Sequence, residues 1–130
     1  MKKRTERQIE APFAYKGLDR VIHERARLSV LTSLLTHPQG LSFVELKQLC
    51  DLTDGNLARH LQVLEEERMV RLTKEGEGGR GQTMARVTAS GRKRYMAYLA
   101  ILEQVVRDAA SLAQADQDPL IGQLSPLKAQ

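Results

Sequence analysis

The most constraining feature of the sequence is residues 51–70, DLTDGNLARHLQVLEEERMV, in which an apolar stripe lies opposite an unusual polar face. Leu57, Leu61 and Leu64 follow i, i+4, i+7 spacing, which is the period of an amphipathic helix, and Thr53 before them is a suitable N-cap. At roughly 100° per residue, the side away from these leucines carries a set of polar positions and one glycine. They are Gly55, Arg59, Gln62 and Glu66, with Asn56 and Val63 beside them.

Two helices are predicted before this one. Helical spacing of apolar residues runs from Leu18 to His37 and stops at Pro38-Gln39-Gly40. Ser42-Phe43-Val44-Glu45 is a capping box, which begins a short helix that reaches about Cys50. We expect this helix to bury Phe43, Leu46 and Leu49. Only the three residues 51–53 then separate it from the amphipathic helix.

A change of period after Met69 predicts a β-hairpin. Val70, Leu72 and Lys74 alternate, Thr83 to Val87 alternate back, and EGEGGRGQ lies between them. Residues 76–81 match G-x-G-x-x-G formally, but no helix follows, so a dinucleotide site is not expected. The glycines suit a loop that presents Arg80, a side chain of the kind that enters a narrow minor groove. The alternative is a loop that is merely soluble.

Thr88 is expected to cap a long final helix that reaches about Ala115. Its apolar seam outruns a three-helix core, which favours homodimerisation, although packing onto its own domain remains the alternative. The positions expected at the dimer interface are Tyr95, Tyr98, Leu99, Leu102, Val105, Val106 and Ala109. The predicted organisation is a basic arm (residues 1–17), a helical and hairpin domain (18–90), a dimerisation helix (91–115) and an irregular tail (116–130).

Composition indicates a cytoplasmic protein of one main domain without a membrane segment, since no apolar run reaches roughly 18 residues. The basic start MKKRTERQ is not followed by an apolar stretch, so it does not resemble a secretory signal. The net charge of +4 leans toward a polyanionic partner. Its distribution is more informative, because residues 68–94 carry eight Lys or Arg against two Glu, whereas residues 31–67 carry two against six Asp or Glu.

The order helix, helix, short turn, helix, hairpin is that of a winged helix-turn-helix. LTDGNLARHLQVLEEERMVRL resembles the recognition-helix segment of small winged-helix transcriptional regulators related to the ArsR and MarR groups. IHERARLSVLTSLL upstream and VTASGRKRY downstream are similar to their flanking segments, so the resemblance covers roughly residues 18–100. It implies a mainly α fold with a small β-hairpin (α+β), a third helix in the DNA major groove and a wing on the backbone or minor groove.

The residue types agree with this implication. Arg suits guanine O6 and N7, and Asn or Gln suits adenine N6 and N7, so Asn56, Arg59 and Gln62 are the expected base readers. The N-cap Thr53 is also expected to contact DNA, and Gly55, two residues later, would let the helix N-terminus approach a phosphate. His60, at the edge of the leucine stripe, is expected to pack and to reach a phosphate. The further expected phosphate or minor-groove contacts are Lys74, Arg80 and the arm Lys2-Lys3-Arg4.

Two departures from the pattern of these regulators matter. ELKQLCDL is similar to the E-L-C-x-C-D-L metal site of some ArsR-type sensors, but Gln48 stands where the first cysteine would be, so neither a metal nor a cofactor is expected. Where relatives usually have a glycine ending the recognition helix, this chain has Arg68. Either Arg68 takes a left-handed conformation, at a cost on the order of 1 kcal/mol, or the helix ends differently.

The sequence therefore predicts a double-stranded DNA-binding transcriptional regulator, a homodimeric repressor that reads a pseudo-palindromic operator with half-sites on the order of 34 Å apart. The rival is a winged-helix module that binds protein, with Asn56, Arg59 and Gln62 as a solvated face. An enzyme is not expected, because the sequence offers no nucleophile paired with a base and no metal quartet. A small-molecule effector is neither indicated nor excluded.

Overall fold

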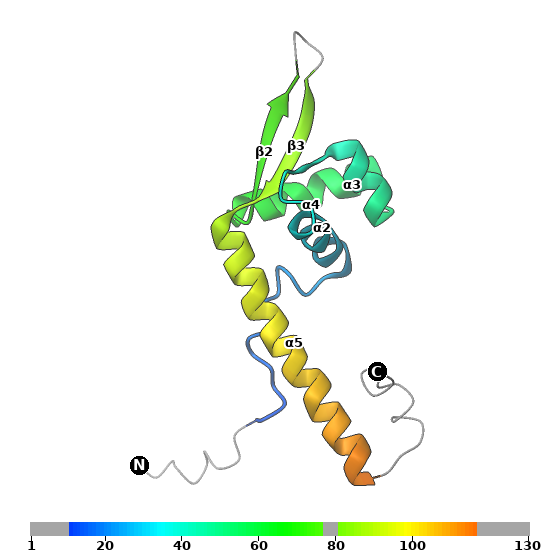
Figure 1. The fold of residues 1–130 in the computed structure, drawn as a ribbon, viewed down its shortest axis with the longest axis vertical. Helices are drawn as coiled ribbons and strands as arrows, with labels where there is room; N and C mark the ends of the chain where they lie inside the picture. The colour runs from blue at the N-terminus through cyan, green and yellow to red at the C-terminus, as the bar shows by residue number, and fades with distance from the viewer. Residues whose placement is uncertain (1–10, 77–80, 117–130) are drawn as a thin grey trace. The chain divides into compact units, whose positions relative to one another are not determined.

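The computed structural model describes residues 11–76 and 81–116 of the chain. Along the sequence its elements are α2 (Arg25–Leu35), β1 (Leu41–Ser42), α3 (Phe43–Cys50), α4 (Asp54–Glu66), β2 (Val70–Glu75), β3 (Gln82–Val87) and α5 (Ala89–Asp116) (Figure 1). The described residues divide into two compact units, Leu18–Tyr98 and residues 11–17 with 99–116. Nearly all the short elements therefore belong to the first unit.

The first helix is shorter than predicted. The sequence indicated a helix from Leu18, whereas α2 begins at Arg25, because Glu24 is extended (φ −153°) and its side chain accepts the amide proton of Arg27 as an N-cap. The preceding residues form turns, in which Oδ1 of Asp19 accepts from the amide of Val21 over 2.9 Å. The predicted stop is confirmed, since α2 ends at Leu35 before the Pro38-Gln39-Gly40 turn.

Helices α3 and α4 form where the sequence predicts them. Ser42 and Glu45 make the reciprocal capping box at the start of α3, with bonds of 3.1 and 2.8 Å. Asp51 ends α3 in left-handed geometry (φ 54°), so the chain turns within three residues into α4. The predicted burial in α3 is partly wrong, because this two-turn helix buries Leu46 while Leu49 is 56% exposed.

The hairpin is part of a three-stranded antiparallel sheet of order β1-β3-β2. Leu72 lies opposite Ala85 across the hairpin, and Leu41 of β1 lies opposite Ala85 on its other side. The two-residue strand β1 is absent from the sequence prediction because it is too short to show an alternation. It joins the end of the α2 segment to the foot of the hairpin.

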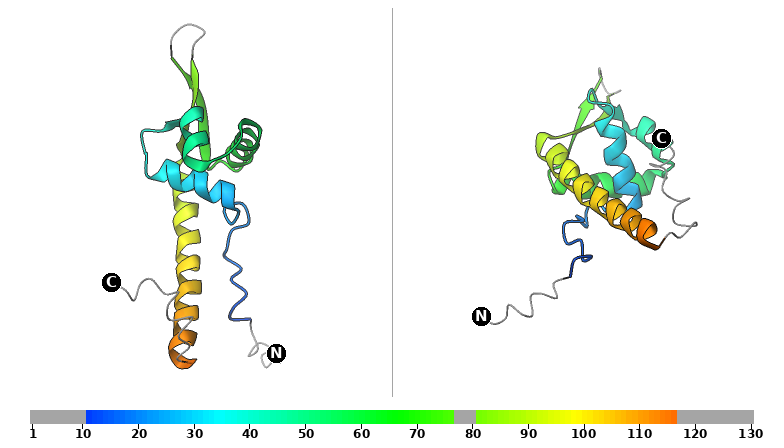
Figure 2. Two further views of the ribbon diagram at one scale, coloured as in Figure 1. Left: turned by 90° about the vertical axis from the view of Figure 1, so that its right-hand side faces the viewer. Right: turned by 60° about the horizontal axis from the view of Figure 1, so that its bottom comes forward.

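The core of the Leu18–Tyr98 unit is built mainly of leucines. The helices α2, α3 and α4 gather beside the foot of the hairpin (Figures 1 and 2). Each of the three helices contributes fully buried side chains. The buried set includes Leu31, Leu34, Leu46, Leu57, Leu61 and Leu64, joined by Met69, Val70 and Ala85 from the hairpin side. This arrangement is a winged helix with a long C-terminal helix, which confirms the predicted α+β fold.

Candidate functional site

The candidate site is the side of α4 that faces away from the leucine core. Thr53 caps the helix by accepting from the amide of Asn56 over 3.2 Å. Asp54, in the first turn, pairs with Lys47 of α3 over 2.8 Å. Because the leucines of α4 are buried, the opposite side of the helix is left to solvent.

Gly55, Asn56, Arg59 and Gln62 are all exposed on this side, and we call them the polar face of α4. The guanidinium of Arg59 donates to Oδ1 of Asn56 over 3.2 Å, and the side-chain Nε2 of Gln62 donates to the carboxylate of Glu66 over 3.4 Å. The long side chains are thus ordered along the helix surface by weak, exposed contacts. Such contacts are easily exchanged for bonds to a ligand with paired donors and acceptors.

Gly55 is not required by the fold. A Cβ built on this residue would meet no atom within 4 Å, and its φ is not positive. Glycine in the first turn of a helix is less favourable than alanine by roughly 0.5–1 kcal/mol, so this position carries a cost without a packing reason. A close approach of another molecule to the N-terminus of α4 would explain why glycine stands at this position.

His60 differs from the other predicted site residues because it is turned into the domain. Its exposed fraction is 9%, and its Nδ1 lies 3.1 Å from the guanidinium of Arg27 on α2. Burial lowers the pKa of the His60 imidazole, Glu24 opposes that shift, and the cations Arg27 and Arg59 reinforce it. The expected packing of His60 is therefore found.

The hairpin strands carry the other predicted cations. Lys74 is exposed near the end of β2, whereas Arg80 lies outside the described residues, as does the Lys2-Lys3-Arg4 arm. Arg86 is not available as a free charge, because it binds both carboxylate oxygens of Glu75, at 2.6 and 3.2 Å. The hydrogen bond from Arg86 holds the pKa of Glu75 below its usual value.

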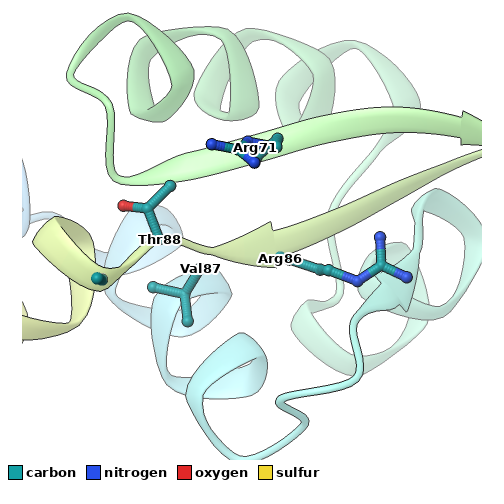
Figure 3. Close-up of a pocket in the computed structure, with 5 residues that line it drawn as sticks. Arg71, Arg86, Val87 and Thr88 are labelled. Atoms are coloured by element: carbon teal, nitrogen blue, oxygen red, sulfur yellow. The ribbon is translucent and has the colours of Figure 1, made fainter.

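A hollow of about 280 Å³ lies at the foot of the hairpin, between Arg71, Arg86 and the Val87-Thr88-Ala89 segment (Figure 3). Arg71 and Arg86 are directly opposed across β2 and β3, so their side chains share one face of the sheet. This is the face that alternates with the core-facing residues such as Val70 and Ala85. The side chains of Arg71 and Arg86 therefore lie on the face turned away from the leucine core, whereas Val87, which also lines the hollow, lies on the same face as its partner Val70.

The turn after α4 is locked to the start of α5. Arg68 takes left-handed geometry (φ 61°), so the first of the two alternatives for this residue is correct. The amide of Thr88 donates to the carbonyl of Met69 over 2.9 Å. Gly91 lies against that carbonyl so closely that a Cβ would overlap the Met69 backbone. The glycine in VTASGRKRY is thus explained by packing.

Arg94 is a functional-site neighbour that the sequence prediction missed. Its guanidinium makes two bonds to Asp19, of 2.5 and 3.1 Å, and one of 2.9 Å to Glu67 at the end of α4. The bonds from Arg94 hold the pKa of Asp19 below its usual value. Arg94 was counted only as part of a basic segment, and its carboxylate partners are too distant in sequence to be paired by spacing.

The predicted interface positions on α5 divide into two groups. Tyr95 and Tyr98 are buried in their own unit, where their hydroxyls bond to Thr32 and His23 over 2.6 and 2.7 Å. These two side chains are therefore already covered within one chain. The remaining positions are half-buried (Leu99, Leu102 and Val105) or exposed (Val106 and Ala109).

In the second unit, residues 11–17 contact α5. The hydroxyl of Tyr15 donates to Asp108 over 2.6 Å, and a Cβ on Gly17 would overlap the side chain of Ile101. Phe13, 63% exposed, and Leu112, 55% exposed, leave apolar surface in this unit.

None of the helices in the described ranges is long and apolar enough to span a bilayer. Those same ranges contain no group of three His, Cys, Asp or Glu side chains placed to share a metal ion.

Residues 26–106 match the family described as winged helix DNA-binding domain. Among curated proteins, an uncharacterized protein of Methanocaldococcus jannaschii is 34% identical over 83 residues, which span 62% of this chain and 86% of that protein. The matched residues contain every element from α2 to the middle of α5.

Solved structures of transcriptional regulators share the fold. The transcriptional regulator homologue from Pyrococcus horikoshii OT3 has a TM-score of 0.64 and 24% identity, over 83% of this chain and 97% of that chain. MepR of S. aureus, solved in complex with DNA, has a TM-score of 0.62 and 18% identity, over 83% and 86% of the two chains. A MarR-family regulator from Silicibacter pomeroyi has a TM-score of 0.55 and 20% identity, over 88% and 77%.

Proposed function

The chain belongs to the winged helix DNA-binding domain family, and on that premise we propose that it is a sequence-specific, double-stranded DNA-binding transcriptional regulator. The observation that carries the proposal is the polar face of α4, where Asn56, Arg59 and Gln62 are exposed together. These side chains have the paired donors and acceptors that discriminate base edges in the major groove. MepR, whose fold is similar, was solved bound to DNA, which supports the same use of the fold here.

The hairpin supplies the sequence-independent part of the proposed contact. Lys74 is exposed on β2, and Arg71, Arg92 and Lys93 are exposed at the foot of the hairpin and on α5. We assign phosphate contacts to Lys74, and to Arg80 and the N-terminal arm outside the described residues. The acidic run Glu65 to Glu67, also exposed, would repel phosphates, so the groove contact is confined to the first half of α4.

The regulator is proposed to act as a homodimeric repressor with no catalytic activity. Support for the dimer comes from α5, whose 28 residues continue beyond the Leu18–Tyr98 unit and leave Val106 and Leu112 exposed. Burial of such apolar surface against a second copy would stabilise a pair by about 25 cal/mol per Å². A two-fold pair would present two polar faces to a pseudo-palindromic operator.

Selection of bound duplexes from random DNA tests the proposal. The expected result is an inverted repeat whose half-sites are centred about one helical turn apart, together with a dimer by light scattering. A promoter carrying that repeat should be less active in cells that express the protein. If the purified protein does not shift even random duplex at low salt, the protein-binding alternative is correct instead.

A further inference from the structure

The recognition helix contains one buried polar side chain whose role the proposed DNA contact does not explain. Ser42 and His60 are the buried polar residues of the described chain, and Ser42 is accounted for by its capping box. His60 lies between Arg59 and Gln62 in sequence, yet it faces α2 and is packed among Leu57, Leu61 and Leu64. The ring of His60 thus joins α4 to α2 on the side of the helix opposite its polar face.

The contact with Arg27 determines the protonation state of His60. Nη1 of Arg27 lies 3.1 Å from Nδ1 of the ring. A guanidinium can donate a hydrogen bond but has no lone pair to accept one, so Nδ1 must be the acceptor. The bonded imidazole is therefore neutral, with its single proton on Nε2.

Arg27 is itself held in place from the α2 side. Its Nε donates to the carbonyl oxygen of Val21 over 2.6 Å, and its amide donates to Glu24 over 2.8 Å. Glu24 Oε1 also lies 3.8 Å from Nδ1 of His60 and 3.9 Å from Nη1 of Arg27. The guanidinium of Arg27 is thus held in position by these bonds. A proton on Nδ1 of His60 would place a cationic imidazolium directly against this cationic guanidinium.

The charged groups that act on the His60 ring can be named for each neighbouring element. The α2 segment contributes the carboxylate of Glu24 and the guanidinium of Arg27, and α4 itself contributes Arg59. Within the described residues, α3 and β2, which also contact α4, contribute no charge that acts on the ring. Glu24 alone favours the protonated form, against burial and two cations.

We propose that His60 is a positioning residue for DNA recognition: its neutral ring accepts from Arg27 and holds α4 against α2, and protonation releases that hold and weakens operator binding. The inference rests on the proposed function. It predicts a direction that simple electrostatics does not, because an added positive charge beside the polar face would by itself strengthen binding to a polyanion. A loss of affinity on acidification therefore distinguishes positioning from charge.

The test is a pH series of operator affinity at constant ionic strength, with full-length protein and a duplex selected at pH 7.5. As the pH is lowered from 7.5 to 5.0 the wild type should lose affinity progressively, approaching a limit of about tenfold once His60 is protonated, the equivalent of one hydrogen bond to a charged group. His60→Asn should bind as the wild type does at pH 7.5 and show no such loss, because Oδ1 of Asn can accept from Arg27 but cannot titrate. Circular dichroism at each pH establishes that the domain stays folded.

Two further variants keep the test decisive. His37→Gln removes a histidine that bonds to Ser33 rather than to this network, so it should follow the wild-type profile. Arg27→Met removes the donor and should flatten the profile even if His60→Asn fails to fold. A wild-type affinity that stays constant or rises on acidification overturns the proposal, as does a folded His60→Asn that falls like the wild type. Failure to select any duplex would instead refute DNA recognition itself.

Discussion

The hydroxyl of Thr88 donates to the carbonyl oxygen of Arg68 over 2.7 Å, and the hydroxyl of Ser90 donates to the same oxygen over 3.0 Å. The left-handed residue that ends the recognition helix is thus bonded to the two side chains that begin α5. The hydroxyl of Thr88 also accepts from the backbone amide of Gly91 over 2.9 Å. The same hydroxyl thus caps the start of α5 and bonds to the turn that follows α4. The orientation of α4 relative to the first turns of α5 depends on this junction.

Arg68→Gly should stabilise the domain by up to about 1 kcal/mol. Glycine removes the steric cost of left-handed geometry at this position, although part of the gain is offset by the greater freedom of glycine in the unfolded chain. Urea unfolding measures the change. The control Glu65→Gly, inside the helix, should lose about 1 kcal/mol, and an equal loss for Arg68→Gly would show that the φ of 61° carries no strain.

Gly91→Ala should destabilise the domain by about 1–3 kcal/mol, because the new methyl would overlap the backbone of Met69, which cannot move aside as a side chain can. The matched control is Gly55→Ala, where the added methyl meets nothing within 4 Å. Gly55→Ala should raise stability by about 0.5–1 kcal/mol through helix propensity. Similar thermal midpoints for the two variants would contradict the packing argument.

Gly55→Ala should nevertheless weaken DNA binding while it stabilises the fold. The methyl would stand at the N-terminus of α4, where we place a phosphate against the helix amides. A fluorescence-anisotropy titration on the selected duplex measures the effect. Unchanged or tighter binding by the more stable variant would remove the phosphate from this position.

Arg59→Ala should lose about 1–3 kcal/mol of discrimination at one base position. The measurement is a competition between the selected operator and its single-base variants. Arg92→Ala is the control, since Arg92 is equally exposed but lies on α5. Equal losses on operator and random duplex would exclude Arg59 from base readout.

Lys74→Ala should weaken binding to all duplexes alike and lower the slope of log affinity against log salt by about 0.9, the contribution of one phosphate. Titrations between roughly 50 and 200 mM salt measure that slope. Lys93→Ala, on α5, should change it less. A sequence-dependent loss would place Lys74 against a base edge.

Asp19→Asn should lower stability at pH 7 by about 1.5 kcal/mol, because Arg94 loses one of its two charged partners and keeps only Glu67. The folded-state pKa of Asp19 lies below its unfolded value, so its contribution is complete above about pH 4 and is lost as the pH falls through the folded pKa. Wild-type stability should therefore decline more steeply than that of Asp19→Asn between about pH 5 and 3. Parallel curves would mean that the Arg94 bond is not formed in solution.

The parts of the fold that local pattern determines were predictable from the sequence. The leucines of α4, the Ser42 capping box and the alternation in the hairpin each depend on neighbours a few residues away. The exposure of Asn56, Arg59 and Gln62 followed from the position of those leucines.

Tertiary pairing explains what the sequence did not predict. The start of α2 at Arg25 depends on Glu24 and on turns in which Asp19 is held by Arg94, 75 residues away. The helical period alone placed His60 at the edge of the leucine stripe, and its burial depends on Arg27, which belongs to another helix. Arg86 counted as a free cation until its bond to Glu75 was visible.

The sheet order β1-β3-β2 leaves β2 as an outer strand of six residues, while β1 on the other side is limited to two. An outer strand offers unpaired backbone groups on which another chain can add a strand. Arg71, Lys74 and Glu75 place charges of both signs along β2. A second hairpin approaching this edge would have to bury those charges, so the strand to which we assign a phosphate contact is at the same time protected against aggregation with its own copies.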